Sequence, residues 1–215
     1  MIEKKLDRSG EGFYYRNEET GDEYRRVVGG MGWPFKEKPG FIVVVAEDFA
    51  EIPGPGKRRL TVIYEKEDDQ IEGIFRKVIE AQRFHWLEGI WGNRSHENMM
   101  ALIRQFNDEQ NKKQGALVHI LYAPKCDEPD NLTYYAHIIK KQLTKPRNLY
   151  FGPESQFPSY LSALPSEKVK GLVDQWPAIA ALGYALAALE VHGPEIPRDK
   201  LQKTALMDYD PFADE

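Results

Sequence analysis

The sequence predicts an α/β domain, with a three-strand antiparallel meander followed by alternating helices and strands in one mixed sheet that carries helices on both faces. Two observations lead to this fold class. Before residue 69, β-branched and alternating runs are separated by short turns, as in consecutive antiparallel strands. After residue 69, apolar residues recur at helical spacing, and these stretches alternate with short apolar runs. With 215 residues, 41% of them hydrophobic, the chain can build one such core with appendages.

The meander is predicted from strands that follow one another closely. Phe13–Asn17 and Glu23–Gly29 alternate apolar and charged residues around a turn, so they form a hairpin. Phe41–Ala46 is the continuous run FIVVVA, which is typical of a strand buried on both faces. Leu60–Glu65 follows a proline- and glycine-rich turn and completes the antiparallel meander.

The second half alternates helices with short strands. Asp69 and Glu72 fit a capping box at the start of a helix over 69–84. This helix is long enough for a right-handed crossover, so the strand Trp86–Trp91 is expected to pair in parallel with the strand ending near Gly29. The remaining predicted elements, in chain order, are a helix around Met99, Ile103 and Phe106, a strand Leu117–Ala123, a helix capped by Asp130, a strand Tyr150–Gly152 and a last helix from Pro177.

The last helix is the most apolar segment of the chain. The spacing of Ile179, Leu182 and Leu186 predicts one stripe buried against the sheet. The segment Pro177–Val191 is shorter than the roughly 20 residues that span a bilayer, so no membrane contact is expected. A single cysteine, Cys126, excludes an internal disulfide, and the amino terminus has no apolar stretch. We therefore expect a cytoplasmic protein.

Three regions are predicted along the chain. Residues 1–22 form an N-terminal arm and the first hairpin strand, 23–195 form the α/β domain, and 196–215 form an acidic tail. The chain contains neither internal repeats nor the glycine-rich signatures of dinucleotide-binding or ATPase folds.

Acidic residues at strand ends are the candidates for chemistry. Carboxylates on the first meander strand and on the strand after the first helix, with one from the last helix, can hold two divalent metals that cleave a phosphodiester. The candidate catalytic and metal-binding residues are Glu88, Asp174 and Asp48. Each also has a structural interpretation. Glu88 could be a solvated strand end, and we favour a helix N-cap for Asp174 and a turn residue for Asp48.

Basic residues are the candidates for binding DNA. They fall into two clusters: Arg58 and Arg59 (after Lys57), and Lys140, Lys141, Lys145 and Arg147. The net charge of −5 argues against a broad nucleic-acid-binding surface. We therefore favour solvated faces for both clusters and keep a local basic groove as the alternative.

Five segments together resemble a known family, the nuclease domain of phage terminase large subunits, whose fold is that of ribonuclease H. They are RVVGGMGWP (Arg26–Pro34), PGFIVVVAEDF, RRLTVIYE, LEGIWGN (Leu87–Asn93) and AALGYAL (Ala180–Leu186). The likeness runs from about Tyr24 to Leu189. It implies a ribonuclease H-like domain and a metal-dependent DNA endonuclease of phage DNA packaging that uses Mg²⁺ or Mn²⁺. The implied partners are DNA and the phage portal, the terminase small subunit or a separate ATPase subunit, since the chain has no ATPase motif.

The chain departs from this family at two metal-binding positions. Where the family's first strand carries an aspartate, this chain has Gly30-Met31-Gly32, and where its last helix carries one, this chain has Ala180. Glu88 alone matches a family carboxylate. Three functions remain open: an active endonuclease domain, a non-catalytic binding or regulatory module of the same fold, and an unrelated α/β protein. The missing acids favour the second over the first, and the resemblance disfavours the third.

Overall fold

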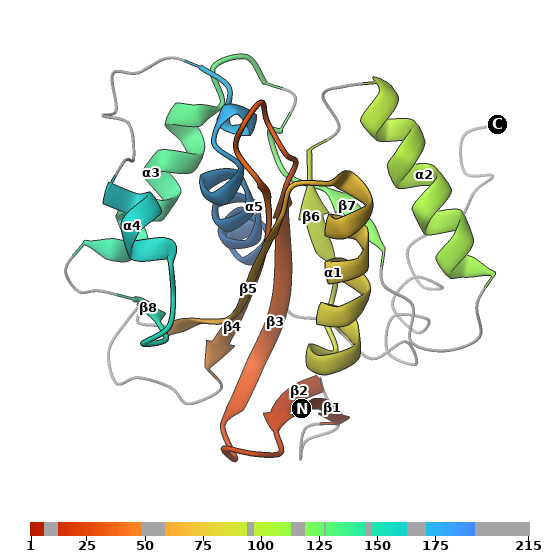
Figure 1. Cartoon of the computed structure of the whole chain (residues 1–215). Coiled ribbons are helices and arrows are strands. Elements are labelled where there is room, and N and C mark those ends of the chain that lie inside the picture. The colour runs from red at the N-terminus through yellow and green to blue at the C-terminus, as the bar shows by residue number, and fades with distance from the viewer. Residues whose placement is uncertain are drawn as a thin grey trace, which may run out of the picture.

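The computed structural model describes residues 1–6, 13–48, 59–93, 97–112, 119–126, 128–144, 148–162 and 171–191 (Figure 1). Its strands are β1 (Ile2–Leu6), β2 (Phe13–Asn17), β3 (Glu23–Gly32), β4 (Gly40–Asp48), β5 (Leu60–Asp68), β6 (Ile90–Gly92), β7 (Ile120–Tyr122) and β8 (Leu149–Phe151). Its helices are α1 (Ile71–His85), α2 (Glu97–Asn111), α3 (Leu132–Leu143), α4 (Phe157–Ser162), the 3₁₀ helix η1 (Val173–Gln175) and α5 (Pro177–Val191).

One mixed sheet contains all eight of these strands. β3, β4 and β5 form an antiparallel meander, and β6 pairs in parallel with β3 through Gly29↔Ile90 and Gly30↔Trp91. β7 continues in parallel beside β6, so the central order is β5-β4-β3-β6-β7. An antiparallel meander whose first strand pairs on its other side with a parallel strand, followed by a second parallel strand, is the ribonuclease H arrangement. The predicted fold class and the predicted parallel pairing with the strand at Gly29 are therefore confirmed.

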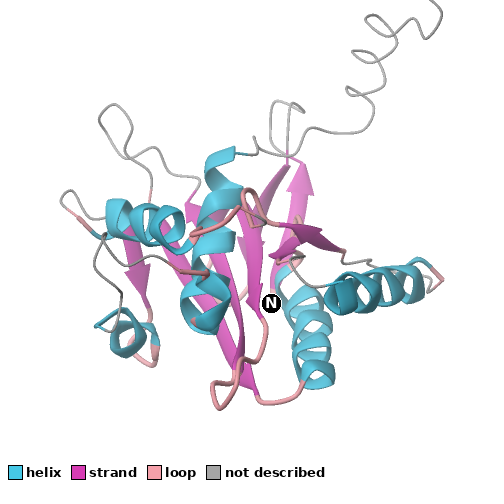
Figure 2. Ribbon diagram, turned by 90° about the horizontal axis from the view of Figure 1, so that it is seen from above, coloured by secondary structure: helices cyan, strands magenta, loops and turns pink. Residues whose placement is uncertain are grey.

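Helices cover both faces of this sheet, as Figure 2 shows from above. One hydrophobic cluster joins the sheet to α1 and α2, and the other joins it to α3, α4 and α5. Successive residues of β4 alternate between the two: Ile42 and Val44 belong to the first cluster, and Val43 and Val45 to the second. The strand is apolar throughout because both of its faces are buried.

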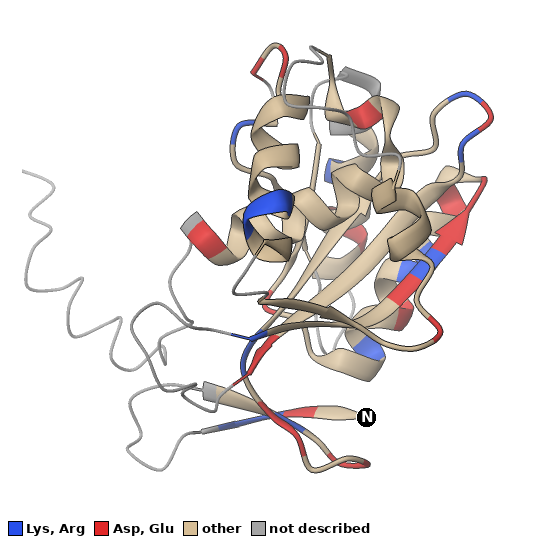
Figure 3. Cartoon of the chain, turned by 90° about the vertical axis from the view of Figure 1, so that its left-hand side faces the viewer, with Lys and Arg blue, Asp and Glu red and all other residues tan. Residues whose placement is uncertain are grey.

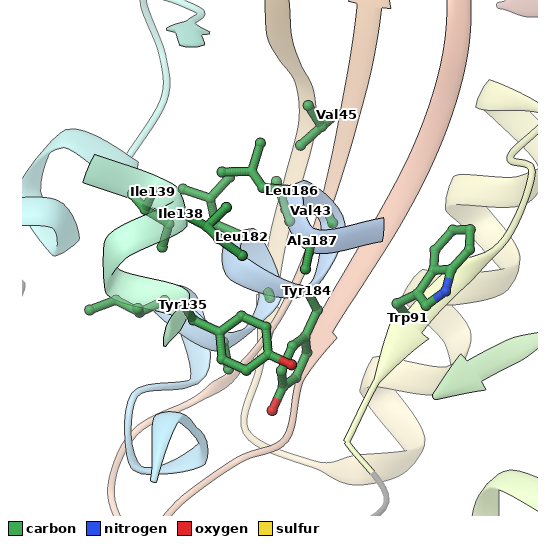
Figure 4. Close-up of a cluster of buried hydrophobic side chains, with 14 of the residues drawn as sticks. Val43, Val45, Trp91, Tyr135, Ile138, Ile139, Leu182, Tyr184, Leu186 and Ala187 are labelled. Atoms are coloured by element: carbon green, nitrogen blue, oxygen red, sulfur yellow. The ribbon is translucent and has the colours of Figure 1, made fainter. Parts of the chain in front are cut away.

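Helix α5 is apolar around most of its circumference because the sheet and α3 both pack against it. Ile179, Leu182 and Leu186 are buried as predicted. Figure 4 shows this cluster, in which the rings of Tyr135 on α3 and Tyr184 on α5 meet edge to face with centroids 4.8 Å apart.

Several local predictions were wrong. The N-cap of α1 is Gln70, with no side-chain cap bond, so Asp69 and Glu72 do not form a capping box. Asp130 has a φ of 58°, and the N-cap of α3 is Asn131. β1, α4 and η1 were not predicted from the sequence. No helix in the described part of the chain is both long and apolar enough to cross a bilayer.

Candidate functional site

The carboxyl ends of β3 and β6 meet at the start of α5. The two strands are parallel, so both end at the same edge of the sheet. Asn93, directly after β6, bonds through Nδ2 to the carboxylate of Asp174 in η1. Trp33, directly after β3, donates from Nε1 to the Asn93 carbonyl oxygen over 3.3 Å. Tyr184 of α5 donates its hydroxyl to Asp174 Oδ1 over 2.7 Å. This edge therefore holds a buried polar cluster.

The cluster is closed to solvent. Asn93 is 1% exposed, Asp174 8% and Tyr184 0%. Burial, and then the adjacent Asp174 carboxylate, raise the pKa of Tyr184 well above its ordinary value, so its hydroxyl stays protonated and keeps donating. Burial also raises the pKa of Tyr135, whose ring packs on Tyr184. The cluster is built to hold a carboxylate between two neutral donors.

Helix α5 lies directly on β3 beside this cluster. A Cβ atom on Gly30 would lie 2.0 Å from the carbonyl oxygen of Ala181, and one on Gly32 would lie 2.1 Å from that of Pro177. Both contacts are with helix backbone, which cannot turn aside as a side chain can. Glycine is therefore required at both positions because the backbone of α5 occupies the space above them. Both glycines belong to the stretch Gly30-Met31-Gly32, in which the resembled family carries its first-strand aspartate.

Glu88 lies at the other end of β6. Its backbone N–H bonds to the Val27 carbonyl over 2.9 Å, and the strand begins only at Ile90. Glu88 and Asn93 are five positions apart, which corresponds to about 16 Å at the rise of a strand. The carboxylate is held by the guanidinium of Arg26, with Nη2 to Oε2 at 2.6 Å and Nε to Oε2 at 3.0 Å. Glu88 is thus the partner of a buried arginine.

Asp174 is not at the position of the predicted N-cap. The residue before α5 is Trp176, and Asp174 precedes it by two positions, inside η1. The structure assigns Asp174 to the buried cluster with Asn93 and Tyr184.

Asp48 lies at a third place, at the end of β4 and opposite Tyr24. Its Oδ2 is 3.4 Å from Nε of Arg59. Burial raises the pKa of Asp48, and the Arg59 charge opposes that shift. A cavity of about 430 Å³ adjoins it, lined by residues that include Asp22, Tyr24 and Thr61.

The three candidate acids therefore do not converge. β4, which carries Asp48, and β6, which follows Glu88, flank β3 on opposite sides, and Asp174 lies beyond the far end of β6. In the part of the chain that the structure describes, no three histidine, cysteine, aspartate or glutamate residues come close enough to hold a metal ion. Two divalent cations need several oxygens around one point. The described residues thus do not fit a two-metal centre built from Glu88, Asp174 and Asp48.

Two of the described basic candidates, Arg59 and Lys141, contact acidic groups. Arg59 contacts Asp48 and lies over the ring of Tyr150, 4.8 Å from its centroid. Lys141, at the end of α3, bonds to Glu190 Oε1 over 3.0 Å, and Lys140 beside it is half-buried. Arg58, Lys145 and Arg147 lie outside the described residues. The described basic candidates therefore do not form a continuous basic groove.

The buried polar contacts of Asn93, Tyr184 and Arg26 were not predicted from the sequence. For Tyr184 a signal was present: it is a polar side chain within a run of alanine and leucine, and a buried hydroxyl needs a partner. For Arg26 no signal existed, because Arg25 beside it is exposed and the two look alike in sequence.

Comparisons with known proteins complete this description. No family model matches the chain, and no curated protein matches its sequence. Among solved structures it is similar to the crystal structure of the yeast mitochondrial Holliday junction resolvase Ydc2, with 13% identity and a TM-score of 0.36. That match covers 74% of this chain and 79% of the resolvase. The ribonuclease H-like fold assignment rests on the strand order and pairing.

Proposed function

We propose that this chain is a non-catalytic module on a ribonuclease H-like fold, which works by binding a partner. The resemblance to terminase nuclease domains points to phage DNA packaging as the process. In that setting the partners would be DNA, the portal, the terminase small subunit or a separate ATPase subunit. The active endonuclease with Mg²⁺ or Mn²⁺ is the alternative that the proposal sets aside.

The close contact between β3 and α5 carries the proposal. In the resembled family, an aspartate of the first strand helps to hold the metals. Here the Ala181 and Pro177 carbonyl oxygens lie where any side chain on Gly30 or Gly32 would begin. An aspartate at either position would displace the helix that forms much of the core. The chain lacks the first-strand aspartate, and the backbone of α5 fills the space that its side chain would need. Both observations support a non-catalytic module.

The remaining acids support the proposal in a second way. Glu88 neutralises Arg26, and Asp174 accepts hydrogen bonds from Asn93 and Tyr184. Both oxygens of Asp174 already accept a hydrogen bond, and both oxygens of Glu88 face the Arg26 guanidinium, so a cation would have to share or displace these contacts. Displacing one leaves a buried polar group unsatisfied, which costs about 1–3 kcal/mol for a neutral group and more for a charged one.

The experiment pairs a cleavage assay with a metal-binding measurement on the full chain. We expect no nicking of supercoiled plasmid in Mg²⁺ or Mn²⁺, and no stoichiometric Mn²⁺ binding by calorimetry. The matched variants are Asp174→Asn and Asp48→Asn, each checked for folding by circular dichroism. Cleavage that Asp174→Asn abolishes in a folded protein would overturn the proposal and restore the endonuclease.

DNA binding is tested separately. The chain would be titrated into labelled duplex at several salt concentrations, because phosphate contacts weaken steeply as salt rises. Salt-sensitive binding that is lost in Lys140→Glu/Lys141→Glu would identify DNA as the partner. Absence of binding would direct the search to a protein.

A further inference from the structure

One long stretch of sheet edge is open. β5 pairs with β4 along its whole length, but with β8 only from Leu60 to Val62. From Ile63 to Asp68, the outer edge of β5 has no backbone hydrogen-bond partner among the described residues. Such an edge carries a row of unpaired N–H and C=O groups and can accept another strand.

The opposite edge of the central sheet, at β7, is closed by a side chain. There the side chain of Asn107 on α2 forms hydrogen bonds with both backbone groups of Ile120. Its Nδ2 donates to the carbonyl oxygen over 3.0 Å, and its Oδ1 accepts from the backbone N–H over 2.9 Å. This amide closes the strand against further pairing. No such clamp lies on the outer edge of β5 in the described part of the chain.

A groove runs along the open edge. It has a volume of about 380 Å³, and its walls are β5 and the segment 152–156 that follows β8. Glu65 accepts bonds from Ser155 Oγ, at 2.7 Å, and from the backbone N–H of Gln156. Tyr160 of α4 donates to Glu67 Oε2 over 3.2 Å. These bonds fix the segment on the α4 side of the sheet, beside the edge.

The charges along this edge alternate. Glu65 and Glu67 contact groups on the α4 side, and Lys66 between them projects from the opposite face. Figure 3 looks onto this side of the molecule and shows acidic residues gathered along β5. Directly opposed side chains on paired strands interact, and opposite charges there are favourable.

This pattern argues against a second copy of the chain. In an antiparallel pair, directly opposed side chains share a face. A second β5 centred on Lys66 would place lysine against lysine, and Glu65 against Glu67. A second β5 centred on Glu65 would place that glutamate against its own copy. Like charges meet in both of these registers, whereas a strand with the opposite charge order places unlike charges opposite Glu65, Lys66 and Glu67.

We propose that the outer edge of β5 from Ile63 to Asp68 is a docking site for an extended segment of a partner protein that carries lysine or arginine at two alternate positions. The partner adds one strand to the sheet, and its basic residues lie opposite Glu65 and Glu67. An acidic residue between them lies opposite Lys66. This inference rests on the proposed binding function and names the partner's chemistry.

The test uses the full chain and a labelled peptide, Ac-Thr-Val-Lys-Glu-Lys-Val-Thr-NH2. Its matched control is Ac-Thr-Val-Glu-Lys-Glu-Val-Thr-NH2, in which each charge is swapped. Three opposed charge pairs change sign between the two, so we expect about a tenfold or larger difference in Kd, smaller at high salt. Bound peptide should slow hydrogen exchange of the amides in 63–67.

Variants locate the contact. Glu67→Lys should reduce the preference for the first peptide, and Glu109→Lys on α2, with the same change in net charge, should leave it intact. A peptide N-methylated between its lysines should bind more weakly, because the methyl group removes a backbone donor. Equal affinity for the two charge patterns, or peptide binding without protection of 63–67, would overturn the inference.

The proposed function and the proposed docking site can be refuted independently. Cleavage activity would end the non-catalytic assignment whatever the peptide does. An unprotected edge in a protein that neither cleaves DNA nor binds Mn²⁺ would end this inference alone.

Discussion

Arg26 and Glu88 form a buried ion pair in which Nη2 and Nε of the guanidinium reach one carboxylate oxygen, at 2.6 and 3.0 Å. Nε also lies 3.2 Å from the other oxygen. The two side chains are only 3% and 8% exposed. Arg26 Nη1 is 3.5 Å from the carbonyl oxygen of Leu189, near the end of α5, where a positive charge is favourable. The pair thus connects β3, the residues just before β6 and helix α5.

Removing one partner should destabilise the fold strongly. Glu88→Ala leaves the Arg26 charge buried without its counter-ion, which costs about 3–5 kcal/mol of unfolding free energy. Urea denaturation would measure this loss. Lys77→Ala is the control, because Lys77 and Glu80 form a solvent-accessible, partly exposed pair at 3.7 Å and surface pairs contribute less than about 1 kcal/mol.

The double variant Arg26→Leu/Glu88→Leu distinguishes an unpaired charge from lost packing. Replacing both charges with apolar groups should recover most of the stability that Glu88→Ala loses. An unfolding midpoint unchanged by Glu88→Ala would show that the pair has no structural role.

Restoring the family's first-strand acid should fail. Gly30→Ala brings a Cβ to 2.0 Å from the Ala181 carbonyl oxygen, so β3 or α5 must shift. Gly30→Asp adds a buried charge to the same clash. We expect both variants to lose about 1–3 kcal/mol of unfolding free energy or more, as overpacked core substitutions do. Thermal melts against Gly152→Ala, where nothing lies within 4 Å of the new Cβ, would check this.

The fold was predictable because its signals are local. The run FIVVVA within β4 is apolar at every position because both of its faces are buried, and that pattern is visible without any partner. The length of the α1 segment implied a crossover that returns β6 to the side of β3. The apolar α5 segment likewise indicated a buried helix.

The site was not predictable because its contacts are long-range. Asn93 and Asp174 are 81 residues apart, and Arg26 and Glu88 are 62 apart. The predicted strand Trp86–Trp91 placed Glu88 within a strand, whereas Trp86 ends α1 with a φ of 48° and β6 begins at Ile90. The strand ends at Gly92, so the residue that follows its carboxyl end is Asn93, and Glu88 precedes the strand.

The buried cluster should depend on the Tyr184 hydroxyl. Tyr184→Phe removes a donor to Asp174 inside the protein, and we expect a loss of about 1–3 kcal/mol of unfolding free energy. Tyr160→Phe, which removes a hydroxyl bonded to Glu67 at the surface, is the matched control and should cost less. Equal effects of the two substitutions would show that the buried hydrogen bond stabilises the fold no more than the exposed one.

His85 should make stability fall with acidity. Its ring packs edge to face on Tyr64, with centroids 5.2 Å apart, and its Nδ1 is buried without a hydrogen-bond partner among the described residues. Burial, and then the charge of the amino terminus, lower the pKa of His85 to about 4 from an ordinary value of 6.5. The folded state therefore keeps the imidazole neutral under conditions in which the unfolded chain protonates it.

The sign follows from proton uptake. Well above pH 6.5 the imidazole is neutral in both states and contributes no pH dependence. Between pH 6.5 and 4 the unfolded state binds a proton that the folded state does not, so stability declines as pH falls. The decline from pH 7 to pH 5 is up to about 2 kcal/mol, and the partial exposure of the ring reduces it.

His85→Phe keeps an aromatic ring against Tyr64 and removes the titration. We expect the loss of unfolding free energy between pH 7 and pH 5 to be smaller in this variant than in the wild type. His137→Gln, on the exposed side of α3, removes an imidazole elsewhere and should keep the wild-type decline. Parallel pH profiles for the wild type and His85→Phe would refute the prediction, because the acid sensitivity would then come from other groups.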